Sequence, residues 1–256
     1  MLMAAAFAPG AANAAPASRA VKPLACPSAG TRAVALAKVT DGSTFVTSEG
    51  TEVRLAGVLA PGEGGESLSS SQADGARGAL ARALGTGPLT LGLDDGARDR
   101  YGRVLAQVFA NGTWVQAAML RAGEFRVAPD RVSAPCALLL LSAEGDARAR
   151  RAGHWRDLFF LRTPEEIGNR AGTFQIVEGT VVSASLYRGR AYINFGADYR
   201  SDFTVTVAPA DMRAFRQARF DVKTLTGQRI RVRGWVELYN GPEMQIATPA
   251  AIEALD

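Results

Sequence analysis

The sequence has few of the side chains that bind transition metals or transfer protons near neutral pH. Its 256 residues include one histidine, His154, and two cysteines, Cys26 and Cys136. No Cys-x-x-Cys pair is present, so a zinc site, which usually needs several Cys or His ligands, has no basis in the sequence. The cysteines leave two alternatives, one disulfide in an exported protein or two buried free thiols. We expect the disulfide, which would join the segment before the first strand to a late helix.

Lysine and long apolar runs are also scarce. Only Lys22, Lys38 and Lys223 are lysines, and all other basic residues are arginines. The net charge of +4 permits an anionic partner but does not require one. Beyond the N-terminus there is no run of ~18 apolar residues, which predicts that no segment spans a membrane. With 47% apolar residues, the chain is long enough to form two domains with proper cores.

The N-terminus lacks the basic residues that usually begin a secretory signal, because no Lys or Arg precedes Arg19. It is otherwise rich in alanine, and the sequence Ala12-Asn13-Ala14 resembles a signal-peptidase site. Residues 1–20 are therefore predicted to be a signal peptide or a disordered arm. We expect export, which predicts a periplasmic or secreted protein.

Residues 52–61 are the stretch around which the rest is best interpreted. Polar and apolar side chains alternate from Glu52 to Leu55, as in a strand with one buried face, and a glycine-rich loop at 61–66 follows. This strand carries Arg54. About fifty residues later, a tight turn at 99–103 ends in a second arginine, Arg103. Two guanidinium groups on neighbouring β-elements can clamp one phosphate, since each is a planar fork of donors.

Turn and cap signals give the order of elements in residues 32–156 as three strands, a helix, two strands and two helices. The Asp41-Gly42 pair supplies the turn of the first hairpin. Strands are expected at 32–39, 44–48, 52–55, 89–93 and 104–110. Helices are expected to start near Ser69–Ser71, Thr113 and Pro135 and to end at Gly85, Gly123 and Gly153.

A boundary at 157–173 precedes a second block with the same plan. Strands are expected at 174–183, 190–196, 201–208, 229–239 and 244–247, with a helix at 209–218. Five strands with a helix between the third and fourth are typical of a Greek-key barrel of OB type. The sequence predicts a mainly β, α+β protein with two such five-stranded barrels, at 32–156 and 174–256, the first with added C-terminal helices.

The first block, about residues 34–155, resembles the staphylococcal nuclease (thermonuclease) family. The resemblance rests on five segments, Asp41–Thr44, Val53–Pro61, Asp99–Ala106, Trp114–Gly123 and Glu144–Trp155. Members of this family hydrolyse DNA and RNA with one bound Ca²⁺. Two arginines hold the scissile phosphate, a glutamate beside a conserved proline orients or activates water, and two aspartates hold the metal. The resemblance implies that Arg54 and Arg103 bind phosphate, with Tyr101 of the same turn as a further contact.

The resemblance fails at the metal ligands. The positions of the two aspartates are occupied by Ser43 and Leu59, and the position after Pro61 is Gly62, so that the nearest carboxylate, Glu63, comes one residue late. Calcium takes six to eight oxygen ligands, and its affinity depends on how many are charged. The sequence therefore predicts no confident Ca²⁺ site, with Asp41 as the one remaining candidate ligand.

Three functions follow from this pattern. The leading hypothesis is a degenerate nuclease that binds nucleic acid or nucleotide phosphate through Arg54 and Arg103. The alternative is an active, metal-dependent phosphodiesterase or endonuclease on DNA or RNA, if the flexible loop brings Glu63 or Glu66 into the site. The third is an envelope scaffold that binds protein. The two arginines have a structural alternative as well, internal ion pairs with Glu52, Glu63 or Asp99.

The second block carries an alternating run in which Arg229, Arg231 and Arg233 share one strand face. With Tyr192 and Trp235 they could form a single-strand groove, because OB barrels stack bases on aromatic side chains beside basic ones. Residues 174–256 nevertheless hold ten Lys or Arg against nine Asp or Glu. A solvated face, or a face docked on the first domain, explains the run equally well. Glu144 in the last helix of the first block is expected to be an ion-pair partner rather than a catalyst. The sequence does not determine the oligomeric state.

Overall fold

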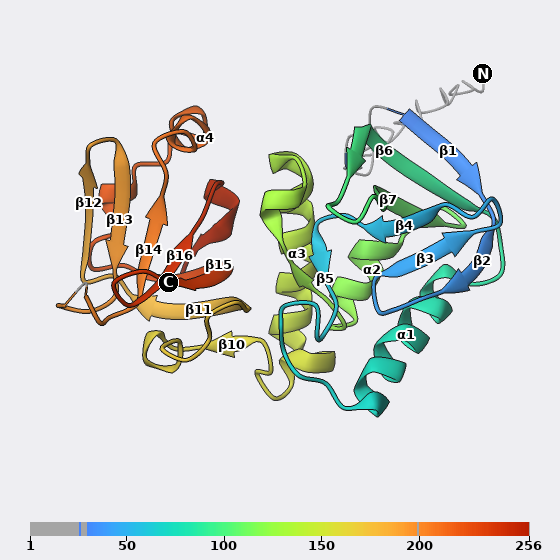
Figure 1. Cartoon of the computed structure of the whole chain (residues 1–256), viewed down its shortest axis with the longest axis horizontal. Coiled ribbons are helices and arrows are strands. Elements are labelled where there is room, and N and C mark those ends of the chain that lie inside the picture. The colour runs from blue at the N-terminus through green and yellow to red at the C-terminus, as the bar shows by residue number, and fades with distance from the viewer. Residues whose placement is uncertain (1–25, 27–29, 199, 256) are drawn as a thin grey trace, which may run out of the picture.

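The computed structural model of the chain describes residue 26, residues 30–198 and residues 200–255. The predicted signal peptide or arm, residues 1–20, lies outside this part, and the predicted export stays a prediction. The described chain forms an N-terminal lobe, residues 30–156, and a C-terminal lobe, residues 157–255. Helix α3 (Ala134–Arg150) belongs to the first lobe and lies between the two sheets (Figure 1).

Each lobe is built on one main sheet that is mostly antiparallel, with one parallel strand pair in the first sheet and two in the second. The strands of the N-terminal lobe are β1 (Gly30–Val34), β2 (Leu36–Val39), β3 (Thr44–Thr47), β4 (Glu52–Leu55), β5 (Val58–Leu59), β6 (Leu89–Arg98), β7 (Val104–Ala110), β8 (Thr113–Trp114) and β9 (Arg126–Val127). Those of the C-terminal lobe are β10 (Leu161–Arg162), β11 (Phe174–Thr180), β12 (Ser183–Tyr187), β13 (Arg190–Asn194), β14 (Thr204–Val207), β15 (Arg229–Leu238), β16 (Pro242–Gln245) and β17 (Ile252–Ala254).

The two sheets share one strand order. The first runs β1-β6-β7-β4-β3-β2, and the second contains β11-β15-β16-β14-β13-β12. In each, the strand before the helix pairs in parallel with the last strand of the set, β4 with β7 and β14 with β16. In the first sheet the two end strands, β1 and β2, are consecutive in the chain, so the sheet curls back on itself. In the second sheet β11 and β12 are related in the same way, with β10 added beside β11. The chain is an α+β protein with OB-type sheets, as the sequence predicts.

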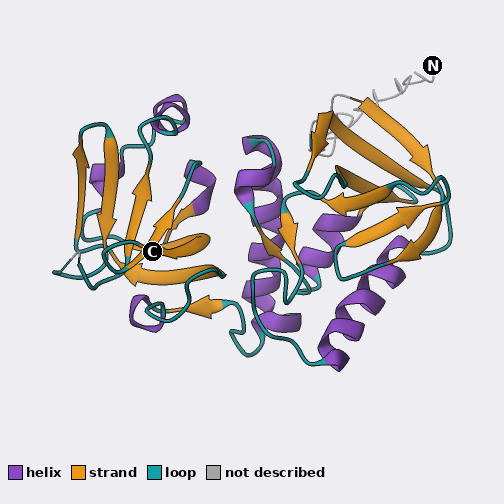
Figure 2. Cartoon of the chain, viewed as in Figure 1, coloured by secondary structure: helices purple, strands orange, loops and turns teal. Residues whose placement is uncertain are grey.

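The helices are α1 (Ser70–Leu84), α2 (Val115–Arg121), α3 and α4 (Met212–Gln217). Helix α1 begins where its signal predicts, with the Ser69 side chain accepting a hydrogen bond from the backbone N–H of Gln72, and Gly85 follows its last residue. The three longest helices pack with the first sheet, whereas the second lobe is mostly strand (Figure 2). Within the described residues, no helix has the length and apolarity needed to cross a membrane.

Several boundaries differ from the sequence prediction; β6, for example, runs to Arg98 instead of ending at residue 93. The strand expected at 32–39 is interrupted at Ala35 and forms β1 and β2, because its two halves pair with different strands, β6 and β3. The strand expected at 174–183 is divided between β11 and β12 for the same reason. Thr113 begins the short strand β8 instead of capping a helix, and α2 starts at Val115 without a side-chain cap.

The two lobes are joined by an apolar cluster. Leu59 and Ala128 of the N-terminal lobe pack in it with Phe174 and Ile176 of β11. Trp155 and Phe160, at the chain crossing between the lobes, complete the contact. Because these side chains are buried, the lobes are packed together rather than connected by a free linker. The predicted boundary at 157–173 is itself structured, since β10 pairs in parallel with β11.

Cys26 and Cys136 form a disulfide between the segment before β1 and the first turn of α3. The bond closes a loop over a sequence separation of 110 residues. A cross-link over such a long loop restricts the unfolded chain strongly and thereby favours the folded state. The expected pairing is confirmed, and it is the bond that an oxidising compartment allows.

Candidate nucleic-acid interface

Arg54 lies near the end of β4 with its guanidinium group pointed across the first hairpin. In the antiparallel pairing of β3 and β4 it faces Thr44. The residue is 8% exposed, and its Nη1 donates a hydrogen bond to the buried hydroxyl of Ser43 at 2.8 Å. The same Nη1 forms an ion pair with the carboxylate of Glu63. The strand therefore delivers Arg54 to a site where a carboxylate is already present.

The glycine-rich loop after β5 places Glu63 at this site. Gly62 adopts a left-handed conformation with φ +86°, which lets the loop accommodate the residue that separates Pro61 from Glu63. One carboxylate oxygen of Glu63 accepts a hydrogen bond from the backbone N–H of Ala60 at 2.7 Å. The other accepts from the Ser43 hydroxyl and from Arg54. The late position of Glu63 in the sequence is thus compensated by the loop.

Glu66 stabilises the loop and does not enter the site. Its Oε2 accepts hydrogen bonds from the backbone N–H groups of Gly62 and Gly64, each at 3.2 Å. Its carboxylate also forms an ion pair with Arg126 of β9, which is 1% exposed. Gly64 is needed for this contact, because a Cβ there would lie 1.6 Å from Nη2 of Arg126. Of the two loop glutamates that the sequence offers, the structure brings only Glu63 to Arg54.

Arg103 reaches the same region from the strand beside β4. It immediately precedes β7, which pairs in parallel with β4. Its Nε donates to Asp99 at 2.6 Å, and its Nη1 donates to the Thr44 hydroxyl at 3.2 Å. Burial raises the pKa of Asp99, but hydrogen bonds from Arg103 and from the backbone outweigh burial and hold that pKa below its usual value. Asp99 is therefore a charged, fixed partner that orients Arg103.

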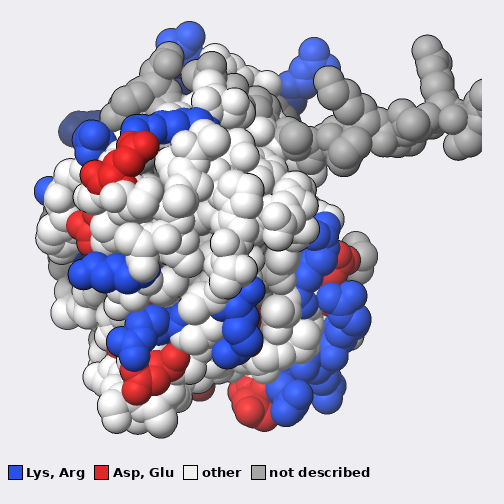
Figure 3. Space-filling model, turned by 90° about the vertical axis from the view of Figure 1, so that its right-hand side faces the viewer, with Lys and Arg blue, Asp and Glu red and all other residues white. Residues whose placement is uncertain are grey.

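The two arginines open onto one cleft of about 660 Å³ between the lobes. Its charged lining consists of Arg54, Arg100, Arg103, Arg131, Glu63 and Asp99. Four guanidinium groups against two carboxylates leave an excess of positive charge. By contrast, on the outer face of the N-terminal lobe Lys and Arg form separate groups around a broad uncharged centre (Figure 3). The cleft is thus a better place for an anion than that face.

Both arginines retain donors for a ligand. The expectation of internal ion pairs is correct for Arg54 with Glu63 and for Arg103 with Asp99. Nevertheless, Nη2 of Arg54 and Nη2 of Arg103 donate to no group among the residues that the structure describes. Neither nitrogen is among the buried atoms that lack a partner, so both reach solvent. The ion pairs orient the guanidinium groups, and both residues line the cleft.

The residues at the family's metal position do not fit Ca²⁺. The Ser43 hydroxyl is fully buried and already bonded to Arg54 and Glu63. Leu59 is 3% exposed and offers only hydrocarbon. Asp41 accepts from the backbone N–H of Ser43 at 2.8 Å and lies 4.0 Å from Arg103. No group of three His, Cys, Asp or Glu side chains in the described chain could hold a metal ion. The carboxylates nearby, Glu63 and Asp41, already lie against Arg54 and Arg103, so that a cation here would be repelled by two guanidinium groups and would find few free charged oxygens.

The prediction that Arg231 and Arg233 of β15 line a nucleic-acid groove is wrong. Arg233 is 0% exposed and forms ion pairs with Glu144 and Glu253. Arg231 pairs with Glu178 and Glu253. Neither guanidinium is available to a nucleic acid, because both are neutralised within the protein. The alternative of a face docked on the first domain is correct for Arg233, which pairs with Glu144 of α3. Arg231 pairs within its own lobe, and Arg229 is exposed, as the solvated-face alternative expects.

Of the two aromatic candidates of the second block, only one lines the cleft. Tyr192 lies on β13, paired with Ser185 and Thr206, and is not part of the cleft lining. Trp235 lies on β15 and lines the cleft with Arg54, Arg103 and Tyr101. Arg131 also lines the cleft, and no motif in the sequence pointed to it. Arg100, which sits inside the recognised turn, could have been found there.

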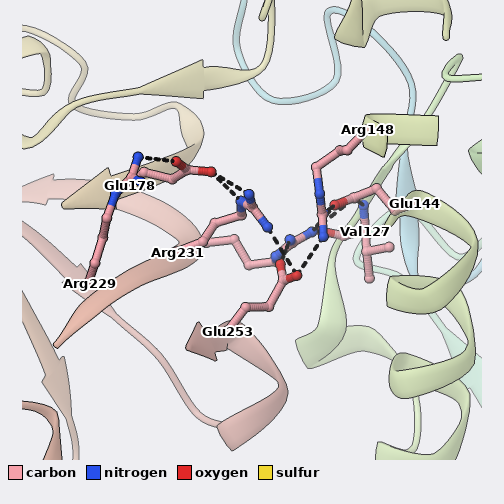
Figure 4. A network of polar contacts seen from close by, with 8 residues as sticks. Val127, Glu144, Arg148, Glu178, Arg229, Arg231 and Glu253 are labelled. Atoms are coloured by element: carbon pink, nitrogen blue, oxygen red, sulfur yellow. Dashed lines mark hydrogen bonds and ion pairs between the residues drawn. The ribbon is translucent and has the colours of Figure 1, made fainter. Parts of the chain in front are cut away.

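Figure 4 shows the ion-pair network that joins the lobes. Glu144 of α3 is fully buried and accepts from the backbone N–H of Val127 at 2.7 Å and from Nη1 of Arg233 at 2.9 Å. Arg148, one turn later, bridges Glu144 and Glu253. Alternating charges on three elements thus neutralise one another away from water. The expectation that Glu144 is an ion-pair partner agrees with these contacts.

This network predicts a loss of stability in acid. Burial raises the pKa of Glu253, but the charges of Arg233, Arg148 and Arg231 outweigh burial and leave that pKa below its usual value of 4.5. The native state therefore favours the charged form of Glu253. The stabilisation is fully present above about pH 4.5 and is lost as the pH falls through the lower pKa of the native state.

Urea unfolding between about pH 3 and pH 7 should show this decline in stability. Glu253→Gln should flatten it, whereas Glu237→Gln, an exposed control on β15, should not. Equal slopes in all three proteins would contradict the assignment.

Fold and site together define an OB-type domain with two arginines at a cleft, joined to a second OB-type lobe. The family model of staphylococcal nuclease homologues matches residues 52–157. This part of the chain is therefore similar to staphylococcal nuclease homologues, and the resemblance seen in the sequence is confirmed there. The match does not extend over the C-terminal lobe. No curated protein matches the chain.

Proposed function

We propose that this protein binds nucleic acid by its phosphate groups in the cleft between the lobes and is weak as a nuclease. The observation that carries the proposal is that Arg54 and Arg103, fixed by Glu63 and Asp99, each retain a solvent-facing donor on one cleft. Arg100 and Arg131 add positive charge to its lining. Guanidinium groups bind phosphate oxygens through parallel hydrogen bonds, and this interaction does not require a metal.

Weak hydrolysis follows from the donor set at the family's metal position. A bound cation would lower the pKa of water and stabilise the charge that develops on phosphate. Ser43 and Leu59 cannot supply the charged oxygens for such a cation, and the arginines alone stabilise phosphate charge without generating hydroxide. The site therefore favours binding over turnover.

A second candidate, a slow phosphodiesterase, is supported by the position of Glu63. Its carboxylate lies against Arg54 on the cleft wall, next to where a phosphate held by that arginine would sit. A carboxylate there can accept a proton from a water that attacks phosphorus. Both carboxylate oxygens of Glu63 already accept hydrogen bonds, one from the Ala60 N–H and one from the Ser43 hydroxyl. An attacking water would have to displace one of these donors, which predicts slow turnover.

The arginines give the decisive test. Binding of a labelled single-stranded oligonucleotide, followed by fluorescence anisotropy at low salt, should weaken by at least about tenfold in Arg54→Ala/Arg103→Ala, and the salt slope should fall by about two. A matched control, Arg77→Ala/Arg82→Ala, removes two exposed charges from α1 and should change binding by less than about twofold. Equal binding by the wild type and the Arg54/Arg103 variant would refute the proposal. Absence of binding even at low salt would favour the protein-binding scaffold.

Glu63→Gln separates the two candidates. If the cleft only binds, removing the anion that competes for Arg54 should tighten oligonucleotide binding severalfold and leave no cleavage to lose. If Glu63 is a general base, plasmid or RNA cleavage present in the wild type should disappear in this variant. Cleavage assays with Ca²⁺, with Mg²⁺ and with EDTA complete the comparison. Strong metal-dependent cleavage by the wild type would overturn the weak-nuclease part of the proposal.

A further inference from the structure

Trp235 is the one cleft residue with a large apolar ring that comes from the C-terminal lobe. It lies on β15, is half-buried, and lines the cleft with Arg54, Arg103 and Tyr101 of the N-terminal lobe. Its ring contacts that of Phe174, its cross-strand neighbour, edge to face with 5.9 Å between centroids. This contact restricts the tilt of the indole. The C-terminal lobe therefore contributes an oriented aromatic surface to a phosphate-binding cleft.

Contacts made by the residues before and after Trp235 in the chain fix its position relative to the arginines. Two residues before it, Arg233 forms the buried ion pair with Glu144 of α3. One residue after it, the N–H of Val236 donates to the carbonyl of Thr173 at 2.8 Å. Next to Thr173, the N–H of Phe174 donates to the carbonyl of Gly64 at 2.7 Å, in the loop that carries Glu63. The indole and the phosphate-binding residues thus belong to one connected framework.

Tyr101, the other aromatic residue of the cleft, is engaged with cations. Its ring is 67% exposed, but the guanidinium carbons of Arg100 and Arg103 lie 4.8 Å and 5.3 Å from its centroid. Cation–π contacts of this kind orient an arginine and occupy the ring. No cation–π contact is formed by Trp235 among the residues that the structure describes. Trp235 is therefore the better platform for a ligand base.

We propose that the ligand is a single-stranded nucleic acid, with one phosphate at Arg54 and Arg103 and a nearby base stacked on Trp235. This inference rests on the proposed phosphate-binding function and adds its substrate class. Every base has a π-face, so stacking on an indole binds unpaired bases of any sequence. In a duplex those faces are covered by neighbouring base pairs, and the indole gains nothing from them. The C-terminal lobe thus discriminates single strands, and the N-terminal lobe supplies the phosphate contacts.

The test compares three labelled probes of equal length, a thymidine oligonucleotide, a duplex and an abasic strand with the same phosphates. The wild type should bind the thymidine strand at least about tenfold more tightly than the abasic strand. Trp235→Ala should weaken binding of the thymidine strand by about 5- to 100-fold, the range that base stacking supplies, and leave the abasic strand unchanged. Trp235→Phe should retain most of the affinity, because phenylalanine still offers a ring. Thermal melting of each variant monitors its fold.

Each result has a distinct meaning. Equal losses for the thymidine and abasic strands in Trp235→Ala would show that the indole only supports the cleft, and the inference would be wrong. Equal wild-type binding of duplex and single strand would refute it too. In both cases binding that still depends on Arg54 and Arg103 would leave the proposed function standing. Failure of the proposed function itself would appear differently, as arginine-independent binding or none to any probe.

Discussion

Replacing Glu144 with leucine is expected to lower the free energy of unfolding by about 3–5 kcal/mol. The substitution removes the carboxylate that pairs with Arg233, and both side chains are 0% exposed. It also removes the acceptor of the Val127 N–H, at 2.7 Å, which would then be buried without a partner. An unpaired buried cation costs much more than the original pair contributes, because its desolvation is no longer offset. Urea unfolding followed by circular dichroism measures the change.

Two variants control this prediction. Glu144→Leu/Arg233→Met removes both charges and should regain much of the lost stability, since an apolar pair often replaces a buried ion pair at little cost. Asp146 lies on α3, like Glu144, and is an exposed partner of Arg121. Asp146→Leu should therefore change stability by no more than about 1 kcal/mol. A Glu144→Leu protein within about 1 kcal/mol of the wild type would mean that the network does not join the lobes as described.

Leu59→Asp is expected to destabilise the protein by at least about 3 kcal/mol and not to restore a metal site. Leu59 stands where the family has a metal-binding aspartate, but here it packs with Phe160 and Phe174 in the cluster between the lobes. The substitution leaves a cavity and places a carboxyl group among apolar side chains. Burial raises the pKa of such a carboxyl group, so the loss of stability should grow as the pH rises from about 4 to 8.

Calcium supplies the decisive comparison for this variant. Thermal unfolding of Leu59→Asp, alone and with Ser43→Asp, is measured with Ca²⁺ and with EDTA, and the melting temperatures should be the same. Leu59→Met, which conserves volume, should cost less than about 1.5 kcal/mol and serves as the matched control. A rise in melting temperature that saturates with Ca²⁺ would show that the position still accepts a metal, because ligand binding to the native state stabilises it.

The replacement of the metal ligand and the docking of the second lobe are thus connected at one residue. An aspartate at position 59 would face Phe174 and Ile176 of β11, where a charge is costly. A leucine there buries apolar surface from both lobes. Keeping a carboxylate at position 59 would therefore destabilise the interface, and in this chain that position is part of the packing between the lobes.

The two arginines of the candidate site could be found from the sequence because their placement depends on local pattern. Strand alternation put Arg54 on β4, and the Asp99–Arg103 turn put Arg103 at the start of β7, its neighbour in the sheet. The helix signals at Ser69 and Gly85 likewise acted within a few residues. The outcome for Glu63 was undecided, because it depends on how Gly62 and Glu66 fold the loop against Arg126.

By itself the sequence determined the OB-type order of strands, the nuclease-like domain, the two arginines and the absence of the aspartates from the metal positions. These features follow from period, turn chemistry and motif, which act over short stretches of chain. Only the tertiary structure decided that Arg233 is neutralised in an interface while Trp235, two residues further along the same strand, lines the cleft. Alternation places both side chains on one face of β15. The partner of Arg233, however, is Glu144 of α3, about ninety residues earlier in the chain. Such contacts are set by packing between distant segments, which no local pattern encodes.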